Sequence, residues 1–369
     1  MHLETLRLIN FKNYQKIEFN FHQEINCLVG ENGVGKTNVL DAIYYLSLAK
    51  SSFNISDSHI IRHETSFFSI FGKFLKDEKS YNVKCTSGRN NKKSIALNDE
   101  EYRKIRDHVG NFPVVLISPN DTDIIRGISE SRRRFVDGII AQIDKEYLDH
   151  LLNYNHALKQ RNTLLKQTEK KSLLDPDLLD TFDRILIHTG TQIHKIREKF
   201  IRQFIPILHE TYSDISDQKE HVDIHYRSDL GNSDFKARLK ASIDRDVLMG
   251  RTSIGIHRDD YILMIDGHPM KKFASQGQQK SLIVSLKIAQ FEIMRKACGF
   301  KPILLMDDVF DKLDDHRIGK IMNLVAGHAF GQIFVTDARP ERTLAIFESI
   351  DSGIRIYHIH EGKAEILIS

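Results

Sequence analysis

The chain has 369 residues, and its 53 Lys and Arg nearly balance its 50 Asp and Glu, for a formal charge of +3. This balance excludes a histone-like polycation, and 28% charged with 41% hydrophobic residues excludes a disordered tail protein. No apolar run is long enough to span a membrane and no signal peptide is recognisable, so we expect a cytoplasmic protein without membrane contact. Three cysteines without C-x-x-C spacing argue against a disulfide framework or a zinc site.

The first hundred residues have the alternating pattern of β-strands. Strands are predicted at residues 3–9, 16–21 and 25–29, and antiparallel hairpins over 66–75, 80–86 and 94–98. Polar turns separate the hairpin strands, as expected for an antiparallel sheet.

The pattern changes to helical between about residues 126 and 243. Apolar residues recur there at spacings of three, four and seven, and Asp175-Pro176-Asp177 separates two long segments. We expect an antiparallel pair of helices of roughly 30 Å each. Beyond residue 250, strands are predicted at 262–265, 303–306, 333–336 and 354–358, with helices at 281–295 and 316–326.

A phosphate-binding motif lies between the predicted strand 25–29 and a predicted helix. The pattern G-x-x-x-x-G-K-[ST] is matched by Gly30, Glu31, Asn32, Gly33, Val34, Gly35, Lys36 and Thr37. Glycines let the backbone wrap a triphosphate, Lys36 reaches the β and γ phosphates, and Thr37 offers a hydroxyl to Mg²⁺. The motif predicts ATP and Mg²⁺ as cofactors.

A second site is predicted where an apolar strand ends in two carboxylates. The run 302–306 is followed by Asp307, the expected Mg²⁺ ligand of a Walker B motif, and by Asp308, placed to activate the attacking water. The alternative is that both carboxylates merely cap the following helix.

A third candidate site is the small polar turn before the predicted helix 281–295. Ser275, Gly277 and Gln278 lie about 30 residues before the Walker B strand, where a helix N-terminus can bind an anion. Taken alone, the turn is as typical of an ordinary N-cap.

The spacing of the first two motifs predicts the domain organisation. Thr37 and Asp307 must meet around one Mg²⁺, yet 270 positions separate them. The helical third is therefore expected to be an insertion, with half of an ATPase head at residues 1–125, a helical lobe at 126–245 and the other half of the head at 246–369.

These segments resemble the ABC/SMC-like ATPases of chromosome maintenance and recombination, and within them the RecF family of bacterial recombination mediators. The similarity rests on GENGVGKT, SQGQQK and LLMDDVFDKLD, with LINFKNY, SPND, SRRRFVD and GIHRDD in support. It implies an α/β fold: an ABC-type P-loop ATPase head with a mixed sheet and an antiparallel β-subdomain, interrupted by a helical lobe.

The same resemblance implies function. It implies a weak, DNA-stimulated ATPase that dimerises on ATP, binds double-stranded DNA, gaps and junctions, and loads RecA together with RecO and RecR in DNA repair, replication restart and the SOS response. Lys12 and Asn13 would lie near the nucleotide, and Ser275, Gly277 and Gln278 would contact the γ-phosphate bound to the other subunit. Residues 311–314 resemble the D-loop. Gln276 and Asp308 fit the family, whereas Ile256 replaces an expected Pro and the switch residue near Thr336 and Asp337 is not identified.

Two basic groups are candidates for DNA contact. Arg132, Arg133 and Arg134 form the densest cluster, and Arg89, Lys92 and Lys93 lie on a predicted hairpin tip. The alternatives are a solvated helix face and a polar turn. For His257-Arg258-Asp259-Asp260 we favour an ion-paired structural or interface role.

Other functions remain open at this point. A chromosome-organising head or a transport subunit would have the same ABC-type ATPase fold. The predicted insertion is too short for the long coiled coil of the first, and it separates the phosphate loop from the signature motif too widely for the second. A small-molecule P-loop kinase would have a complete site in one chain, with the SQGQQK turn accidental.

Overall fold

The computed structural model describes residues 1–53, 55–89, 92–167, 174–216, 220–231, 234–309, 315–326, 329–341 and 353–368. The chain divides into two compact units, the first formed by residues 1–121, 214–217 and 280–369, and the second by residues 122–213 and 218–279. The predicted lobe of residues 126–245 falls almost wholly in the second unit, which continues to Gln279. The chain thus leaves the first unit and returns to it, as the spacing of the two motifs requires.

The first unit contains an antiparallel sheet of order β2-β1-β4-β5-β6-β7. Its strands are β1 (His2–Phe11), β2 (Tyr14–Asn20), β4 (Phe67–Lys76), β5 (Lys79–Gly88), β6 (Ser94–Leu97) and β7 (Glu100–Glu101). The predicted N-terminal strands and both hairpins are confirmed. Phe68, Ile70 and Phe74 of β4 are buried and belong to the core, so the alternation in the sequence correctly indicates which side chains of this strand face the core.

A second sheet of the first unit has the order β15-β14-β3-β13-β12-β8. Five strands are parallel, namely β3 (Ile25–Val29), β8 (Val114–Ile117), β12 (Ile303–Asp307), β13 (Ile333–Asp337) and β14 (Ile354–His360), and β15 (Lys363–Ile368) pairs antiparallel at the edge. Every residue of β3, β12 and β13 is buried, as their apolar runs predict.

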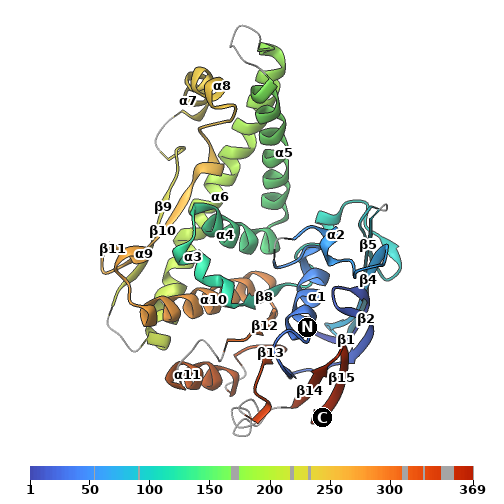
Figure 1. Ribbon diagram of the computed structural model, residues 1–369. Helices are drawn as coiled ribbons and strands as arrows, with labels where there is room; N and C mark the ends of the chain where they lie inside the picture. Colours follow the sequence, from blue (N-terminus) through green and yellow to red (C-terminus); the bar gives the residue numbers. More distant parts are fainter. Residues whose placement is uncertain are drawn as a thin grey trace. The chain divides into compact units, whose positions relative to one another are not determined.

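Helix α1 (Lys36–Leu48) packs against strands of both sheets, and one apolar core joins them (Figure 1). The remaining elements of the first unit are α2 (Asp57–Ile60), the short 3₁₀ helices η1 (Ile105–Asp107) and η2 (Pro119–Asp121), most of α10 (Gln276–Cys298) and α11 (Asp315–Ala326). Because α1 is held between two sheets, the loop that precedes it has a fixed position.

The second unit is mainly helical. It contains α3 (Thr122–Arg126), α4 (Ser129–Ile143), α5 (Lys145–Gln167), α6 (Pro176–Ser216) except its last turn, α7 (Phe235–Ala241), α8 (Ile243–Met249), η4 (Ile256–Arg258) and α9 (Met270–Phe273). The predicted helix pair is confirmed as α5 and α6, but α6 has 41 residues and is about 60 Å long, because it continues through Pro206. Asp175 caps its start by accepting bonds from the amides of Asp177 and Leu178.

The expectation of an entirely helical middle third is wrong at one place. Residues 222–227 form β9 (Val222–Arg227), which pairs with β10 (Asp260–Ile265), and β11 (His268–Pro269) completes a three-stranded sheet. The alternation in β9 is short, and its partner strand begins more than 30 residues later.

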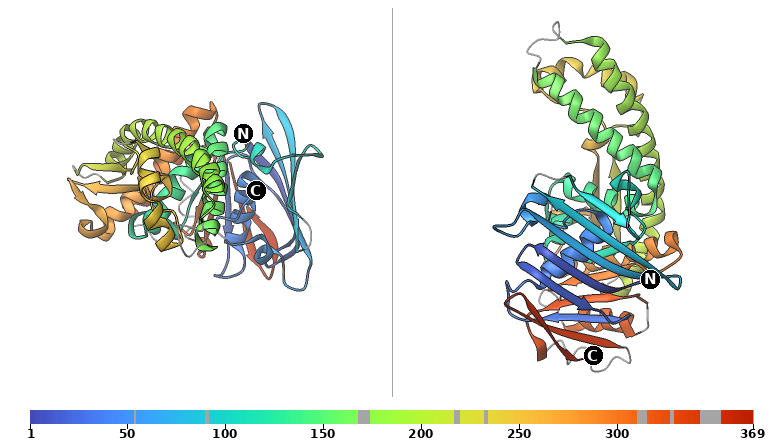
Figure 2. Two further views of the ribbon diagram at one scale, coloured as in Figure 1. Left: turned by 90° about the horizontal axis from the view of Figure 1, so that it is seen from above. Right: turned by 90° about the vertical axis from the view of Figure 1, so that its right-hand side faces the viewer.

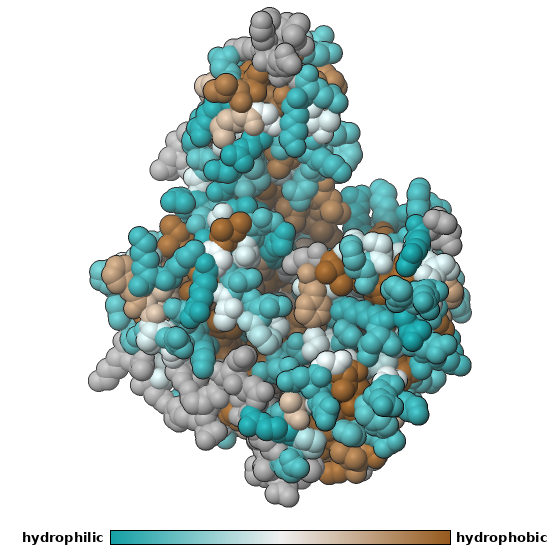
Figure 3. Space-filling model, in the orientation of Figure 1, coloured by the Kyte–Doolittle hydropathy of each residue, from teal (hydrophilic) through white to brown (hydrophobic). Residues whose placement is uncertain are grey.

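Exposed apolar side chains gather near α7 and α8, where Leu248 is 88% exposed (Figure 3).

Two further properties follow from the described residues. No helix among them is long and apolar enough to cross a bilayer. Cys27 and Cys85 are buried, Cys298 is partly buried, and all three are free thiols. Cys27 lies in β3 as a small core residue, and burial raises the pKa of its thiol.

Candidate nucleotide-binding site

The loop between β3 and α1 has the backbone of a phosphate-binding loop. Gly30, Gly33 and Gly35 have φ of 144°, 85° and 115°, which side chains rarely adopt. A Cβ on Gly35 would lie 2.4 Å from Nδ2 of Asn13, and one on Gly30 would lie 2.4 Å from the carbonyl oxygen of Ile359. Conformation therefore favours glycine at all three positions, and at Gly30 and Gly35 the close neighbours also leave no space for a side chain.

Lys36 begins α1 and turns back across this loop. Its ammonium donates to the carbonyl oxygens of Gly30 at 2.7 Å and Glu31 at 2.9 Å, and its side chain is buried. A cation is thus held where the amides at the N-terminus of α1 also favour an anion. Glu31, Asn32 and Val34 complete the loop, and the carbonyl oxygen of Val34 accepts a bond from the Asn13 amide at 2.9 Å.

Thr37 and Asp307 meet as the spacing argument predicts. The Thr37 hydroxyl donates to Oδ1 of Asp307 at 2.8 Å, across 270 positions of sequence. Their contact follows from the sheet, because β12 and β3 both flank β13 and end at the same edge.

Thr336 is a site residue whose contacts the sequence did not predict. Its hydroxyl donates to Oδ1 of Asp307 at 2.8 Å and accepts a bond from the Asp308 amide at 2.9 Å. In β13 it lies directly beside Asp307 of β12, so the register brings them together. Two sequence signals pointed to this position: Thr336 comes just before the end of a buried strand, and the resemblance places the switch residue near it.

The Asp307 carboxylate lies in a poorly solvated place. Burial raises its pKa, and the hydroxyls of Thr37 and Thr336, with Lys36 further away, oppose that rise. The next residue, Asp308, has a left-handed backbone with φ of 45°. A carboxylate and a hydroxyl in contact are the oxygen ligands that Mg²⁺ prefers, so this donor set fits the predicted cation.

Lys12 and Asn13 lie beside the phosphate loop, as the resemblance implies, but Lys12 has a partner within the protein. Its ammonium is 2.7 Å from Oδ2 of the buried Asp41 and 4.4 Å from the centre of the Phe53 ring. Asp41 also accepts bonds from the hydroxyls of Ser51 and Ser52. Asp41 was not predicted as part of the site, although it lies only four residues after Thr37.

The signature residues of the second unit form an N-terminal capping box. The Ser275 amide donates to the Gln278 side chain at 2.6 Å, and the Gln278 amide donates to the Ser275 hydroxyl at 3.2 Å. Gly277 lies between them in the first turn of α10, and the Gln278 side-chain amide also donates to Glu220. The N-cap geometry is therefore present, and a role towards nucleotide stays a prediction. The D-loop residues 311–314 lie outside the described residues.

Three of the six predicted DNA-contact residues are held by partners within the protein. Arg132 binds Asp260 through two nitrogens at 2.7 and 3.2 Å, and Arg133 donates to the carbonyl oxygen of Asp259 at 2.7 Å. Lys93 pairs with Asp57 at 2.8 Å and donates to the Ala49 carbonyl oxygen. DNA contact through these three residues would require breaking those bonds.

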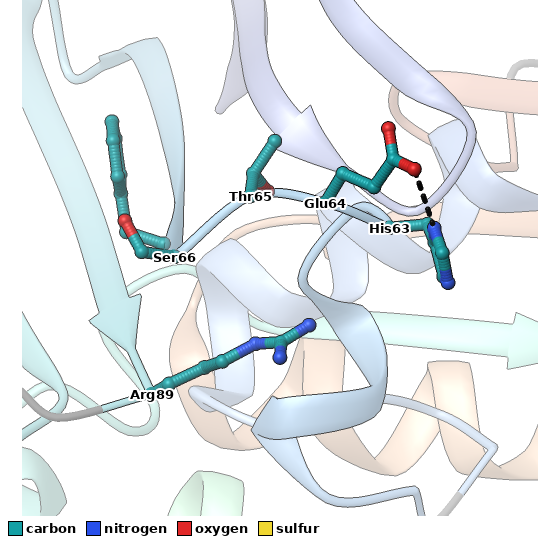
Figure 4. A pocket seen from close by; sticks show the side chains of 6 residues that line it. His63, Glu64, Thr65, Ser66 and Arg89 are labelled. Carbon is teal, nitrogen blue, oxygen red and sulfur yellow. Dashed lines mark ion pairs between the residues drawn. The ribbon is translucent and has the colours of Figure 1, made fainter.

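The other three predicted DNA-contact residues are more accessible. Arg134 has a side chain 58% exposed and pairs with Glu130 one turn away. Lys92 is exposed, and Arg89 lines an open pocket of about 640 Å³ with His63, Glu64 and Phe67 (Figure 4).

The GIHRDD segment is part of a buried ionic network in the second unit. Arg197 donates to Asp137 at 2.8 and 2.9 Å, to Asp259 at 2.8 Å and to the Ile256 carbonyl oxygen at 3.0 Å. The Tyr154 hydroxyl and Nδ1 of His257 are 2.8 Å apart. The favoured ion-paired structural role agrees with these contacts.

The fold and these contacts define an ABC-type P-loop ATPase head. The family described as RecF/RecN/SMC N terminal domain matches residues 2–365. The chain belongs to this family, in its RecF branch, because two full-length relatives named DNA replication and repair protein RecF exceed 40% identity. The relative from Cytophaga hutchinsonii is 42% identical, over 99% of this chain and 97% of the relative. The relative from Flavobacterium johnsoniae is 43% identical, over 97% of this chain and 100% of the relative.

Solved structures agree with the family. The recombination mediator protein RecF with ATPrS, in the RecFOR pathway, has a TM-score of 0.89 and 29% identity over 99% of this chain and 98% of its own. The corresponding RecF structure with ATP has a TM-score of 0.88 and 29% identity, over 99% of this chain and 97% of its own. An Smc head domain from Pyrococcus furiosus shares the fold alone, with a TM-score of 0.57 and 16% identity over 99% and 96%.

Proposed function

We propose that this chain is an ATP-dependent DNA-binding protein of recombinational repair. The observation that carries the proposal is the 2.8 Å contact between Thr37 and Asp307, since it unites the phosphate loop with a carboxylate 270 positions away. ATP-bound RecF structures that match over almost the whole chain support ATP as the nucleotide.

In this proposal each residue of the site has a defined role. The loop from Gly30 to Gly35 and Lys36 bind the phosphates, and Thr37 with Asp307 holds Mg²⁺, which neutralises charge on the β and γ phosphates when bound. Thr336 positions the Asp307 carboxylate and the Asp308 amide through its two hydrogen bonds. Asp308 orients and deprotonates the attacking water.

Hydrolysis by this machinery is expected to be slow and stimulated by DNA. We further propose that Ser275, Gly277 and Gln278 contact the γ-phosphate bound to a second copy of the chain. Their capping box fixes the first turn of α10, and the N-terminus of a helix favours a bound anion, which supports that role. The homodimer would then form only with ATP.

The proposed DNA substrates are duplex, gapped and junction DNA. The proposed partners are RecR and RecO, with which the protein would load RecA in DNA repair, replication restart and the SOS response in the cytoplasm. The support is the family and the RecFOR pathway named for the matching structures. No contact of the described residues favours the small-molecule kinase or the chromosome-organising head.

Sedimentation velocity of an Asp308→Asn variant tests the two-site scheme. This variant should bind ATP without hydrolysing it, and it should sediment as a dimer with ATP and as a monomer with ADP or without nucleotide. Gapped DNA should co-sediment with the ATP-bound form only.

Lys36→Ala is the matched control, because it removes the cation of the phosphate loop and should stay monomeric at every ATP concentration. A monomeric Asp308→Asn protein at saturating ATP would contradict the scheme. An ATPase rate that does not depend on protein concentration or DNA would favour a site complete within one chain.

A further inference from the structure

One face of the antiparallel sheet in the first unit has no described element of that unit packed on it. The other face of this sheet packs on α1 and the core, and it takes Phe68, Ile70 and Phe74 of β4. The intervening residues of β4, among them Phe67, Phe71 and Lys73, point the opposite way. Figure 2 (right) shows β1, β2, β4 and β5 in front, with no described helix or strand of the first unit over them. We call this the outer face.

An aromatic ring lies between two cations at the middle of the outer face. Arg7, Phe71 and Lys84 are directly opposite one another on β1, β4 and β5. The guanidinium carbon of Arg7 is 4.4 Å from the centre of the Phe71 ring, and the Lys84 ammonium is 5.5 Å from it. Neither cation pairs with a carboxylate among the residues that the structure describes.

The other charges of the outer face are few. Lys73 pairs with Glu4 at 2.8 Å, and Lys16 is exposed. Two exposed acids end the row that contains Phe71: Glu18 lies opposite Arg7 in β2, and Glu101 of β7 lies beyond Lys84 and Ala96. Within the described strands, positive charge without an ion-pair partner therefore centres on the Phe71 ring.

A second aromatic residue lies on the same face of the same strand. Phe67 precedes Phe71 by four residues, about 13 Å along β4, and is 40% exposed. It lines the open pocket of about 640 Å³ together with Arg89 and His63 (Figure 4). The outer face thus has two accessible aromatic rings along one strand, of which Phe71 lies between two cations.

We propose that the outer face binds single-stranded nucleic acid, with bases stacking at Phe71 and Phe67 and phosphates contacting Arg7 and Lys84. Sequence-tolerant proteins bind single strands by combining stacking on aromatic rings with cations along the backbone, and a β-sheet face is one common platform. A duplex cannot use the rings in this way, because its bases are already stacked on one another. The proposal deepens and rests on the proposed DNA binding, since gapped DNA contains a single-stranded segment.

The absence of tryptophan from the sequence gives a direct test. In a Phe71→Trp variant the indole is the only tryptophan, and a dT oligonucleotide of about 15 nucleotides should quench its emission. An abasic oligonucleotide of the same length, which keeps the phosphates and lacks the bases, should leave the emission almost unchanged. A Phe273→Trp variant reports from an exposed position in the second unit and should not respond to dT.

Binding measurements complete the test. Phe71→Leu and Lys84→Ala should each weaken dT binding in fluorescence anisotropy by about tenfold. Lys199→Ala, an exposed lysine on α6, is the charge-matched control and should leave dT binding unchanged. Equal quenching by dT and abasic strands would overturn the stacking proposal, and stronger quenching by duplex would assign the face to double-stranded DNA.

Failure of this inference can be told from failure of the proposed function. Phe71→Leu should keep ATP-dependent dimerisation, because Phe71 lies outside the nucleotide site. If the unmodified chain does not dimerise with ATP but Phe71→Trp is quenched by dT, the proposed function fails and the outer-face site stands. If dimerisation occurs without base-dependent quenching, only the outer-face site fails.

Discussion

Two buried carboxylate sites, one in each unit of the chain, have different partners. In the second unit, Arg197 is fully buried and has Asp137 and Asp259 as partners, with the Tyr147 hydroxyl bonded to Asp137. In the first unit, the buried Asp307 carboxylate has two hydroxyl donors and no cation in hydrogen-bond contact among the described residues. The charges of Asp137 and Asp259 are balanced within the protein, whereas the charge of Asp307 is left for a bound cation to balance.

This difference predicts that removing Arg197 and removing the charge of Asp307 lower the free energy of unfolding by unequal amounts. Arg197→Met leaves Asp137 and Asp259 buried without their cation, so we expect the free energy of unfolding to fall by about 3 to 5 kcal/mol. Asp307→Asn should change it by about 1 kcal/mol or less, because burial already raises the pKa of this carboxyl and thus disfavours its charged form. The same Asp307→Asn change should abolish ATP hydrolysis.

Urea unfolding followed by far-UV circular dichroism measures both variants, and hydrogen exchange of the α6 amides shows whether the loss is local to the second unit. Equal losses of stability in Arg197→Met and Asp307→Asn would contradict the comparison. Arg202→Met is the control and should cost about 0.5 kcal/mol or less, because among the described residues its exposed side chain pairs only with Glu198 on the same helix.

A smaller effect is expected from His257, the buried imidazole of the second unit. Burial lowers its pKa from 6.5 to about 4, although the hydrogen bond with the Thr252 carbonyl oxygen acts to raise that pKa. The unfolded chain takes up this proton below pH 6.5, and the folded protein does so only near pH 4. Stability should therefore fall as the pH decreases through this window, by up to about 3 kcal/mol from this group.

His257→Gln should remove that contribution, so the difference in unfolding free energy between the two proteins should narrow from pH 7 to pH 4. Asp259 and Asp183 act in the opposite direction, because burial raises the pKa of each, but they are common to both proteins and cancel in the difference. A difference that does not vary with pH would show that His257 titrates normally.

The sequence predicted the parts of the site that depend on local pattern. The phosphate loop, Lys36 and Asp307 each lie next to a strand whose apolar run can be recognised, and the spacing of Thr37 and Asp307 required an insertion. Thr336 was missed as a contact because its role depends on the register of β13 with β12. Asp41 was missed because its partners, Lys12 and Ser51, come from two different segments.

The same limit explains the basic cluster in α4. Three consecutive arginines suggested one surface, but Asp260, the partner of Arg132, is 128 positions away in sequence. Only tertiary structure shows that Arg132 and Arg133 bind within the unit. Strand β9 was missed for a similar reason, since its ladder forms with β10, far along the chain.

The smallest expected effects separate the members of this cluster. Arg134→Ala should change stability by less than about 0.5 kcal/mol, because its pair with Glu130 is exposed. If Arg134 contacts a DNA phosphate, the variant should also reduce the salt slope of ATP-dependent DNA binding by about one.

Arg132→Ala should instead lower stability and leave the salt slope of DNA binding unchanged. The Arg132 side chain is only 12% exposed, and its loss leaves Asp260 without its main partner, so the free energy of unfolding should fall by about 1 to 3 kcal/mol. The slope is measured by anisotropy on duplex DNA at several salt concentrations below those that weaken folding. A flattened slope in Arg132→Ala alone would mean that its bonds to Asp260 open to admit DNA, and an unchanged slope after replacing all three arginines would exclude α4 from the DNA-binding surface.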